Sequence, residues 1–190
     1  MIRNVSMTFC LIVTIVFIWI WHHQSQFNDH SRKAFFHLRN GELEPAIESY
    51  TKAIAYKKRT LFFAHAPSAY NNLGQAYLRK AEYDRAISAF QTVLEIQPNA
   101  VEPYINLTTA YLKQNSPNQA IASCAKALQI SPHVALVHYN LACAYALKKE
   151  NEKSIGALRR AIDLDKQMEA FAKEESVFDE LRSHPLFPSE

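Results

Sequence analysis

The sequence predicts an all-α protein made of stacked antiparallel helix pairs, with an apolar helix before them and a short closing segment after them. Three observations favour this fold class. The 190 residues include only three glycines, too few for a protein of strands joined by tight hairpins. A pattern of apolar and small residues recurs at a fixed step of 34 residues, and an uncharged run near the N-terminus is nearly long enough to cross a membrane.

Composition narrows the functional classes. Apolar residues make up 48% of the chain, enough for a packed core, and the formal net charge is only +3. The one dense basic group is residues 57–59, so we expect no nucleic-acid partner. Cys10, Cys124 and Cys143 form no C-x-x-C pair, which predicts neither a disulfide framework nor a zinc site.

The N-terminal segment predicts a membrane anchor, assigned to residues 1–24. Met7 to Trp21 carries no charge over fifteen residues, and residues 5–21 make seventeen uncharged positions that would contact the membrane. Seventeen helical residues reach about 26 Å, slightly less than a hydrocarbon core of roughly 30 Å. Trp19 and Trp21 suit the aromatic belt at a bilayer surface, so we favour an uncleaved transmembrane helix.

A cleaved secretory signal is the alternative to an anchor, because a basic start and a short apolar run fit both. No A-x-A pattern of small residues follows Trp21, which argues against cleavage. The orientation follows from the flanking charges. Arg3 and the α-amino group precede the run, whereas Arg32, Lys33 and Asp29 follow it, so the balance slightly favours repeats on the periplasmic or lumenal side.

Two sets of residues recur at the 34-residue step and indicate two helices per repeat. The first set is Tyr70, Leu73, Gly74, Tyr77, then Tyr104, Leu107, Thr108, Tyr111, then His138, Leu141, Ala142, Tyr145. The second set is Ala86, Phe90, Val93, Pro98, then Ala120, Cys124, Ala127, Pro132, then Ser154, Leu158, Ala161, Lys166. The small residues at matching positions would let paired helices approach closely.

These residues resemble the tetratricopeptide repeat (TPR) family, which implies a right-handed superhelix of stacked helix pairs. The resemblance gives repeats at residues 67–100, 101–134 and 135–166, and a degenerate copy at residues 27–60. That copy keeps Ala34, Gly41 and Tyr50, but has His30 and His37 where aromatic residues are usual. About six additional residues near 61–66 separate it from the next repeat and would lengthen its second helix or the following loop.

Turn residues mark the breaks between the predicted helices, and the periodic pattern stops near residue 166. Asn40-Gly41, residues 115–118 and residues 149–152 are typical of turns. Residues 167–190 keep scattered apolar side chains among charges, which predicts a capping helix over the last repeat. Ser176 and Asp179 have the spacing of a helix start inside this cap.

No sequence motif indicates catalysis, so we expect no enzyme, no cofactor and no small-molecule substrate. A P-loop, a dinucleotide-binding glycine motif and the H-E-x-x-H motif are all missing from the sequence. His30 and His37 lie seven residues apart, whereas two metal ligands on one helix are expected three or four apart. An unrecognised active site remains the remote alternative.

The resemblance instead implies a protein or peptide client, bound by the inner face that the first helix of each repeat lines. The candidate peptide-binding residues are Asn71, Asn72, Gln75, Arg79, Asn106, Thr109, Lys113, Tyr139 and Asn140. Among these, Asn72, Asn106 and Asn140 keep the 34-residue step and could pair with the backbone of an extended peptide. The alternative is that these amides only satisfy neighbouring helix groups.

The family's clamp for a chaperone C-terminal carboxylate is not reproduced. Asn71, Gln75, Asn106, Leu136 and Asn140 occupy its positions, so the cations that would pair with a carboxylate are missing. We therefore expect a membrane-anchored scaffold or adaptor that binds a client in its groove, in assembly of a membrane complex. The alternative is an obligate structural subunit of such a complex.

Overall fold

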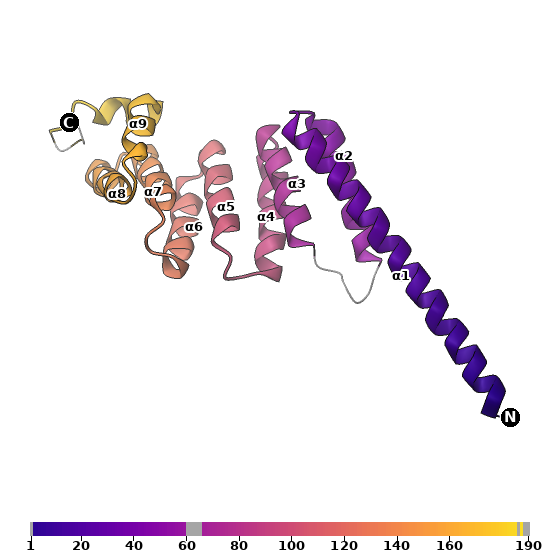
Figure 1. Ribbon diagram of the computed structural model, residues 1–190. Coiled ribbons are helices and arrows are strands. Elements are labelled where there is room, and N and C mark those ends of the chain that lie inside the picture. The colour runs from indigo at the N-terminus through magenta and orange to yellow at the C-terminus, as the bar shows by residue number, and fades with distance from the viewer. Residues whose placement is uncertain (1, 60–65, 186, 188–190) are drawn as a thin grey trace. The chain divides into compact units, whose positions relative to one another are not determined.

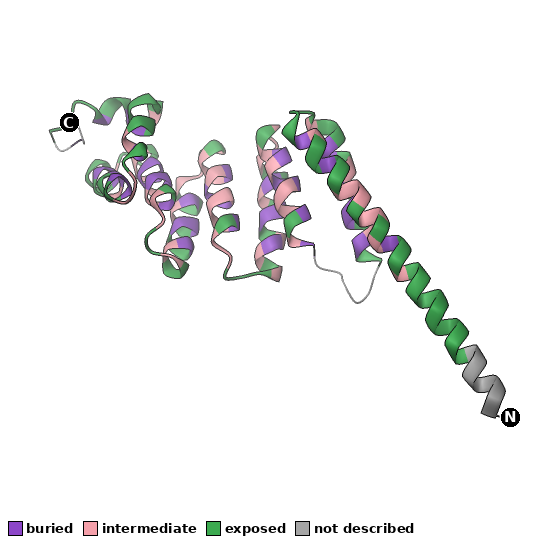
Figure 2. Ribbon diagram, viewed as in Figure 1, coloured by how far each residue is buried: buried purple, intermediate pink, exposed green. Residues whose placement is uncertain are grey.

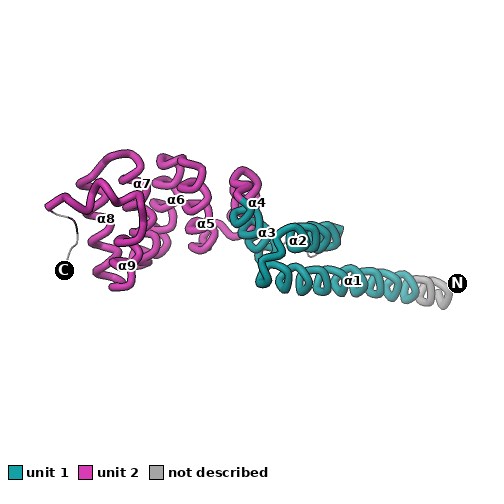
Figure 3. Tube along the Cα trace, turned by 90° about the horizontal axis from the view of Figure 1, so that it is seen from above, with its two compact units in different colours: residues 1–80 teal, residues 81–190 magenta. Residues whose placement is uncertain are grey.

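A computed structural model of the chain describes residues 2–59, 66–185 and 187, with side chains from Phe9 onward (Figure 1). The chain divides into two compact units, residues 1–80 and 81–190, each considered by itself below (Figure 3). All regular elements in the described residues are helices, as the sequence predicts.

The first unit begins with α1 (Ile2–Arg39), a single helix of 38 residues that runs without interruption. The sequence from Ile2 to Arg39 has no glycine or proline, so nothing in it interrupts helical hydrogen bonding. No loop therefore marks the predicted boundary between the anchor and the first repeat. From Phe9 to Trp21 nearly every side chain is exposed, whereas the later part of α1 is buried on one side (Figure 2).

The remaining helices of the first unit are α2 (Leu43–Lys58) and α3 (Pro67–Arg79). Ala34 of α1 and Ala46 and Ala53 of α2 are completely buried, because small side chains let the two helices pack closely. His30 stacks on Tyr56 with ring centroids 5.4 Å apart and thus takes the place of an aromatic residue.

The predicted additional residues of this repeat are only partly described. At 16 residues α2 is two residues longer than the equivalent helices of the later repeats, which have 14 residues each: α4 (Tyr83–Ile96), α6 (Pro117–Ile130) and α8 (Asn151–Leu164). Part of the addition therefore does lengthen the helix. Residues 60–65, which carry most of the predicted addition, lie outside the described part of the chain.

The second unit contains the second helix of three repeats (α4, α6 and α8) and the first helix of two of them (α5 and α7). In chain order they are α4 (Tyr83–Ile96), α5 (Val101–Lys113), α6 (Pro117–Ile130), α7 (Ala135–Leu147) and α8 (Asn151–Leu164). The 13-residue helices α5 and α7 alternate with 14-residue helices, so the predicted two-helix unit recurs in regular lengths.

The turn inside each helix pair has one residue with a left-handed backbone. These residues are Gly41, Ala81, Asn115 and Lys149, with φ between 56° and 79°, and the last three are 34 residues apart. After α5 the amide of Ser116 donates to the carbonyl of Tyr111 at 2.8 Å, and that of Asn115 donates to Leu112 at 3.0 Å. This pair of bonds satisfies carbonyls at the helix end, which explains why the turn recurs.

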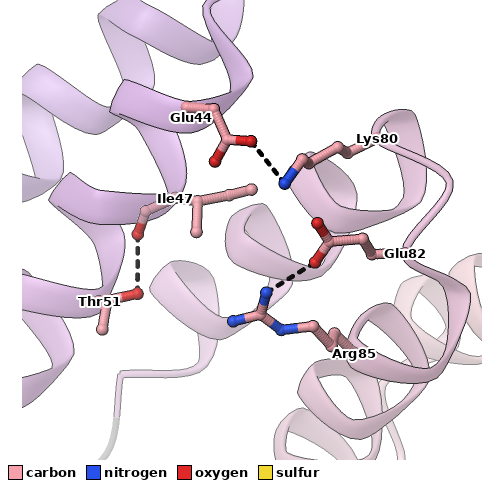
Figure 4. Close-up of polar contacts among 6 residues, drawn as sticks. All are labelled: Glu44, Ile47, Thr51, Lys80, Glu82 and Arg85. Atoms are coloured by element: carbon pink, nitrogen blue, oxygen red, sulfur yellow. Dashed lines mark hydrogen bonds and ion pairs between the residues drawn. The ribbon is translucent and has the colours of Figure 1, made fainter.

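Polar contacts hold the ends of the helices near two of these turns (Figure 4). In the first unit, Lys80 Nζ lies 2.5 Å from Glu44 Oε1 and links the end of α3 to the start of α2. In the second, Arg85 Nη1 lies 2.7 Å from Glu82 Oε2 at the start of α4. Each pair joins an exposed side chain to a half-buried one, and ion pairs near the surface contribute only about 0–1 kcal/mol to stability.

Small residues mediate close packing in the second unit, as predicted. Thr108, Ala120, Ala142 and Ser154 are all buried, and Ser154 Oγ donates to the carbonyl oxygen of Ala142 at 2.8 Å. The hydroxyl thus joins α8 to α7 while staying satisfied in the core.

The C-terminal cap consists of α9 (Gln167–Glu174) and the short 3₁₀ helix η1 (Ser176–Leu181). Phe178 and Leu181 pack with Met168 into the core formed by α7 and α8. A helix does begin at Ser176, and this element is a 3₁₀ helix. The predicted helix start at Ser176 is therefore confirmed, although the residue at the N-cap position is Glu175, which makes no side-chain capping hydrogen bond.

Candidate functional site

The inner face of the second unit contains a pocket of about 360 Å³ between α5, α7 and the cap. The 34-residue step explains its walls, because equivalent positions of neighbouring repeats lie side by side on successive first helices. The lining residues are Thr109, Leu112 and Lys113 of α5, Tyr139, Asn140, Cys143 and Leu147 of α7, and Glu175, Ser176 and Val177 of the cap.

Asn140 is the central polar group of this pocket. Its side chain is buried, with 7% of the residue exposed, and its Nδ2 has no hydrogen-bond partner among the described residues. A buried amide donor without a partner is costly, by about 1–3 kcal/mol, and such groups usually find one. The pocket wall therefore includes a residue with an unsatisfied buried donor, which an acceptor that reached it, such as a peptide carbonyl oxygen, would satisfy.

The walls around Asn140 are largely neutral. Burial raises the pKa of the Cys143 thiol to about 12, with a smaller contribution from Glu175, and burial also raises the pKa of Tyr139. Both groups stay protonated at neutral pH, so Cys143 lacks the thiolate that a nucleophile requires. Lys113 and Glu175 are exposed and place one charge of each sign at the edge.

The cap fixes one wall of the pocket through aromatic contacts. Tyr139 lies 5.9 Å from Phe178 and 6.4 Å from Phe171, measured between ring centroids, both in edge-on geometry. Phe178 in turn lies 6.3 Å from Phe187. The cap thus closes the core and also shapes the inner face, whereas the sequence predicts only the first role.

A second hollow of about 460 Å³ lies beside the pocket and shares Tyr139 and Glu175 with it. Its other lining residues are Leu136, Phe171 and Glu174. Leu136 and Phe171 are 43% and 51% exposed, so apolar surface continues from the pocket toward α9.

Four of the nine predicted peptide-binding residues come together in the pocket: Thr109, Lys113, Tyr139 and Asn140. Asn106 is half-buried on α5 and already has a polar interaction, and it does not line the pocket. Sequence reasoning missed Glu175, Ser176 and Val177, because no periodic pattern indicates that the cap reaches the inner face.

The other four predicted residues, Asn71, Asn72, Gln75 and Arg79, lie on α3 in the first unit. Arg79 Nη1 donates to the carbonyl oxygen of Leu38 at 2.7 Å and so satisfies the end of α1. Burial raises the pKa of the Tyr50 hydroxyl, and the nearby Asn72 amide partly offsets this effect. Arg79 therefore has a local structural role.

Within the described part of the chain, no three His, Cys, Asp or Glu side chains are grouped so that they could hold a metal ion. One helix, Phe9–Arg39 in its described extent, is long and apolar enough to cross a membrane. A signal sequence near an N-terminus has the same property, so length and composition do not distinguish the two.

The tetratricopeptide repeat family matches two stretches of the chain, residues 67–100 and residues 106–169. Among solved structures, MamA (41-end) from Desulfovibrio magneticus RS-1 is similar at 22% identity and a TM-score of 0.71, over 84% of this chain and 87% of that one. A thermophilic TPR protein of Thermus thermophilus is similar at 19% identity and a TM-score of 0.65, over 82% of both chains.

At these identities the structural likeness concerns the fold alone, and no curated protein gives a significant match. The family matches nonetheless cover the repeats whose residues recur at the 34-residue step, and the helices pack as that step predicts. The chain belongs to the tetratricopeptide repeat family.

Proposed function

We propose that the chain is a membrane-anchored TPR scaffold that holds an extended segment of a client protein against the inner face of its second unit. The observation that carries this proposal is the buried Asn140 amide, whose Nδ2 has no partner among the described residues and which lines the pocket. TPR domains generally bind protein or peptide partners, and this donor supplies a reason for an acceptor to bind here.

The pocket suits a peptide better than a charged ligand. Leu112, Leu147 and Val177 provide apolar contacts, and a pocket of about 360 Å³ has room for apolar side chains of a bound peptide. A backbone carbonyl of the peptide would accept the hydrogen bond from Asn140 without reading its sequence. Lys113 and Glu175 at the edge would then discriminate between clients by charge.

Site-specific photocrosslinking in the full chain tests the groove. A photoreactive residue at Leu112, inside the pocket, should capture a discrete client, whereas one at the exposed Gln129 of α6 should not. Asn140→Leu should reduce capture from position 112. Ser154→Ala is the matched control, because it removes a buried hydrogen bond between α7 and α8 whose two residues do not line the pocket.

Equal capture from positions 112 and 129, or capture indifferent to Asn140→Leu, would contradict a groove mechanism. The same preparation also tests whether the chain is an adaptor or an obligate structural subunit. An adaptor in detergent should run as a single species without its client, whereas an obligate subunit should aggregate.

The anchor is the second part of the proposal. The exposed apolar stretch from Phe9 to Trp21 supports membrane contact over residues 5–21, and a tether would raise the effective concentration of the array near a membrane-bound client. We expect the chain to stay in the membrane fraction after extraction with alkaline carbonate. Mass spectrometry should show that its N-terminus is intact. Release of a shortened chain would support a signal peptide instead.

Orientation completes the proposal. The charges nearest the apolar run favour repeats on the periplasmic or lumenal side. Protease added to sealed, right-side-out cells or spheroplasts should then digest the repeats. Digestion only after the membrane is opened would indicate that the repeats lie on the cytosolic side.

A further inference from the structure

The end of α2 returns to the point where α1 would leave the membrane. Lys57 Nζ donates to Gln24 Oε1 at 2.8 Å and lies 5.1 Å from the centre of the Phe27 ring. The ring of Tyr56 lies 6.0 Å from that of His23. Tyr56 and Lys57 therefore lie beside residues 23–27 of α1, although about thirty positions separate them in the sequence.

That level falls at the membrane surface if the anchor spans the bilayer. Gln24 follows Trp21 by three residues, which corresponds to about 4.5 Å along a helix. The headgroup layer beyond the hydrocarbon core is roughly 5–8 Å thick on each side. The last turn of α2 would thus lie in the headgroup layer, next to the aromatic belt of Trp19 and Trp21.

The charge at this level is positive. Lys58 and Arg59 are exposed, whereas Lys57 is buried and its contacts with Gln24 and Phe27 give it a structural role. No acidic residue occurs from position 49 to 59. The one acidic residue on the facing stretch of α1, Asp29, is paired with Lys33 at 2.7 Å and Arg32 at 3.3 Å.

Each of the two exposed cations lies near an aromatic ring. The Arg59 guanidinium carbon lies 5.9 Å from the centre of the Tyr56 ring, and Lys58 Nζ lies 5.9 Å from the centre of the Tyr70 ring. Basic residues in a last helical turn also interact favourably with the helix dipole. The interaction with the helix dipole would be the same wherever the end of α2 lay along α1. The contacts of Lys57 and Tyr56, in contrast, place the end of α2 beside the end of the apolar run.

We propose that Lys58 and Arg59 bind the phosphate groups of anionic phospholipids beside α1, so that the first repeat contacts the membrane surface. The inference rests on the proposed anchor. Each basic residue that reaches an anionic surface strengthens binding about fivefold, so two residues give a preference of roughly 25-fold over a zwitterionic lipid.

The two tryptophans of the chain, Trp19 and Trp21, report on the lipids at this position without any label. The full chain is reconstituted in phosphatidylcholine vesicles, and tryptophan quenching is measured with brominated phosphatidylcholine or brominated phosphatidylglycerol as a minor component. Stronger quenching by the phosphatidylglycerol gives its relative affinity for sites beside α1. The preference should fall as salt is raised.

The charge-reversing variant Lys58→Glu/Arg59→Glu should lose this preference, and Lys58→Gln/Arg59→Gln should lose most of it. The matched control Lys126→Glu/Arg159→Glu changes the net charge equally at exposed positions of the second unit and should keep it. Helicity by circular dichroism should be the same in all variants.

The outcomes separate the two proposals. Absence of quenching by brominated phosphatidylcholine would mean that α1 is not inserted, and the anchor itself would fail. Quenching by both lipids to the same degree in the wild type, or an unchanged preference in Lys58→Glu/Arg59→Glu, would leave the anchor in place and overturn the headgroup site.

Discussion

Replacing Asn140 by leucine should stabilise the protein while weakening client binding. Asn140 is buried with an unpartnered Nδ2 among the described residues, and an apolar side chain of similar size would remove this donor and extend into the adjoining pocket. Removing a buried unpaired group recovers about 1–3 kcal/mol. For a chain of this size about 1 kcal/mol corresponds to roughly 2–4 °C in Tm.

The measurement is thermal unfolding of the full chain in one detergent, followed by far-ultraviolet circular dichroism. Asn140→Leu should raise Tm by roughly 2–12 °C. Ser154→Ala is the reference for a satisfied buried group, since Ser154 Oγ donates to Ala142 at 2.8 Å, and its loss should lower Tm by a few degrees, corresponding to about 1 kcal/mol.

A fall in Tm for Asn140→Leu similar to that for Ser154→Ala would refute the reasoning. It would mean that the amide is satisfied within the fold and belongs to the packing of α7. If Asn140→Leu instead raises Tm and also reduces capture, unfolding cannot explain the reduced capture.

Three other changes should be measurable. Phe178→Ala, which removes a completely buried ring beside Tyr139, should cost about 3–5 kcal/mol and make the cap sensitive to limited proteolysis before the repeats. Ala81→Gly relieves a left-handed backbone with φ of 62° and should raise the free energy of unfolding by about 0.5–1 kcal/mol in denaturant titrations. Burial raises the pKa of Cys124 to about 11 and of Cys143 to about 12, so the folded state retains protons that unfolded thiols release near pH 9.0. The free energy of unfolding should therefore fall as pH rises above about 9, and Cys143→Ala should make that fall shallower in urea titrations at successive pH values.

Local periodicity accounts for most of what the sequence predicts correctly. Leu73 and Tyr77 are buried on α3 as their spacing requires, and Asn115 and Lys149 adopt the left-handed turn at the expected step. Such features depend on contacts within one repeat or between neighbouring repeats, which recur in the sequence itself. The site is less predictable because Val177 reaches the pocket through the packing of a cap that has no repeat to compare with.

The sequence also does not show which residues far apart along the chain lie close together in the fold. The orientation prediction counts Arg32 and Lys33 near the apolar run, but the fold also brings residues 57–59 to the same flank. Because anionic lipids are concentrated in cytoplasmic leaflets, this added charge favours repeats in the cytosol and opposes the prediction from nearby charges. The protease experiment therefore decides between two physical arguments of similar strength.

If α1 spans the bilayer as proposed, its continuity means that the membrane-spanning segment and the first repeat belong to one rigid helix. A flexible linker would let the repeats reorient freely, whereas an unbroken helix transmits torque, so any change in the tilt or rotation of the buried segment must turn Ala34 and the helices packed around it. Membrane thickness would thereby set the angle at which the first unit of this scaffold presents itself.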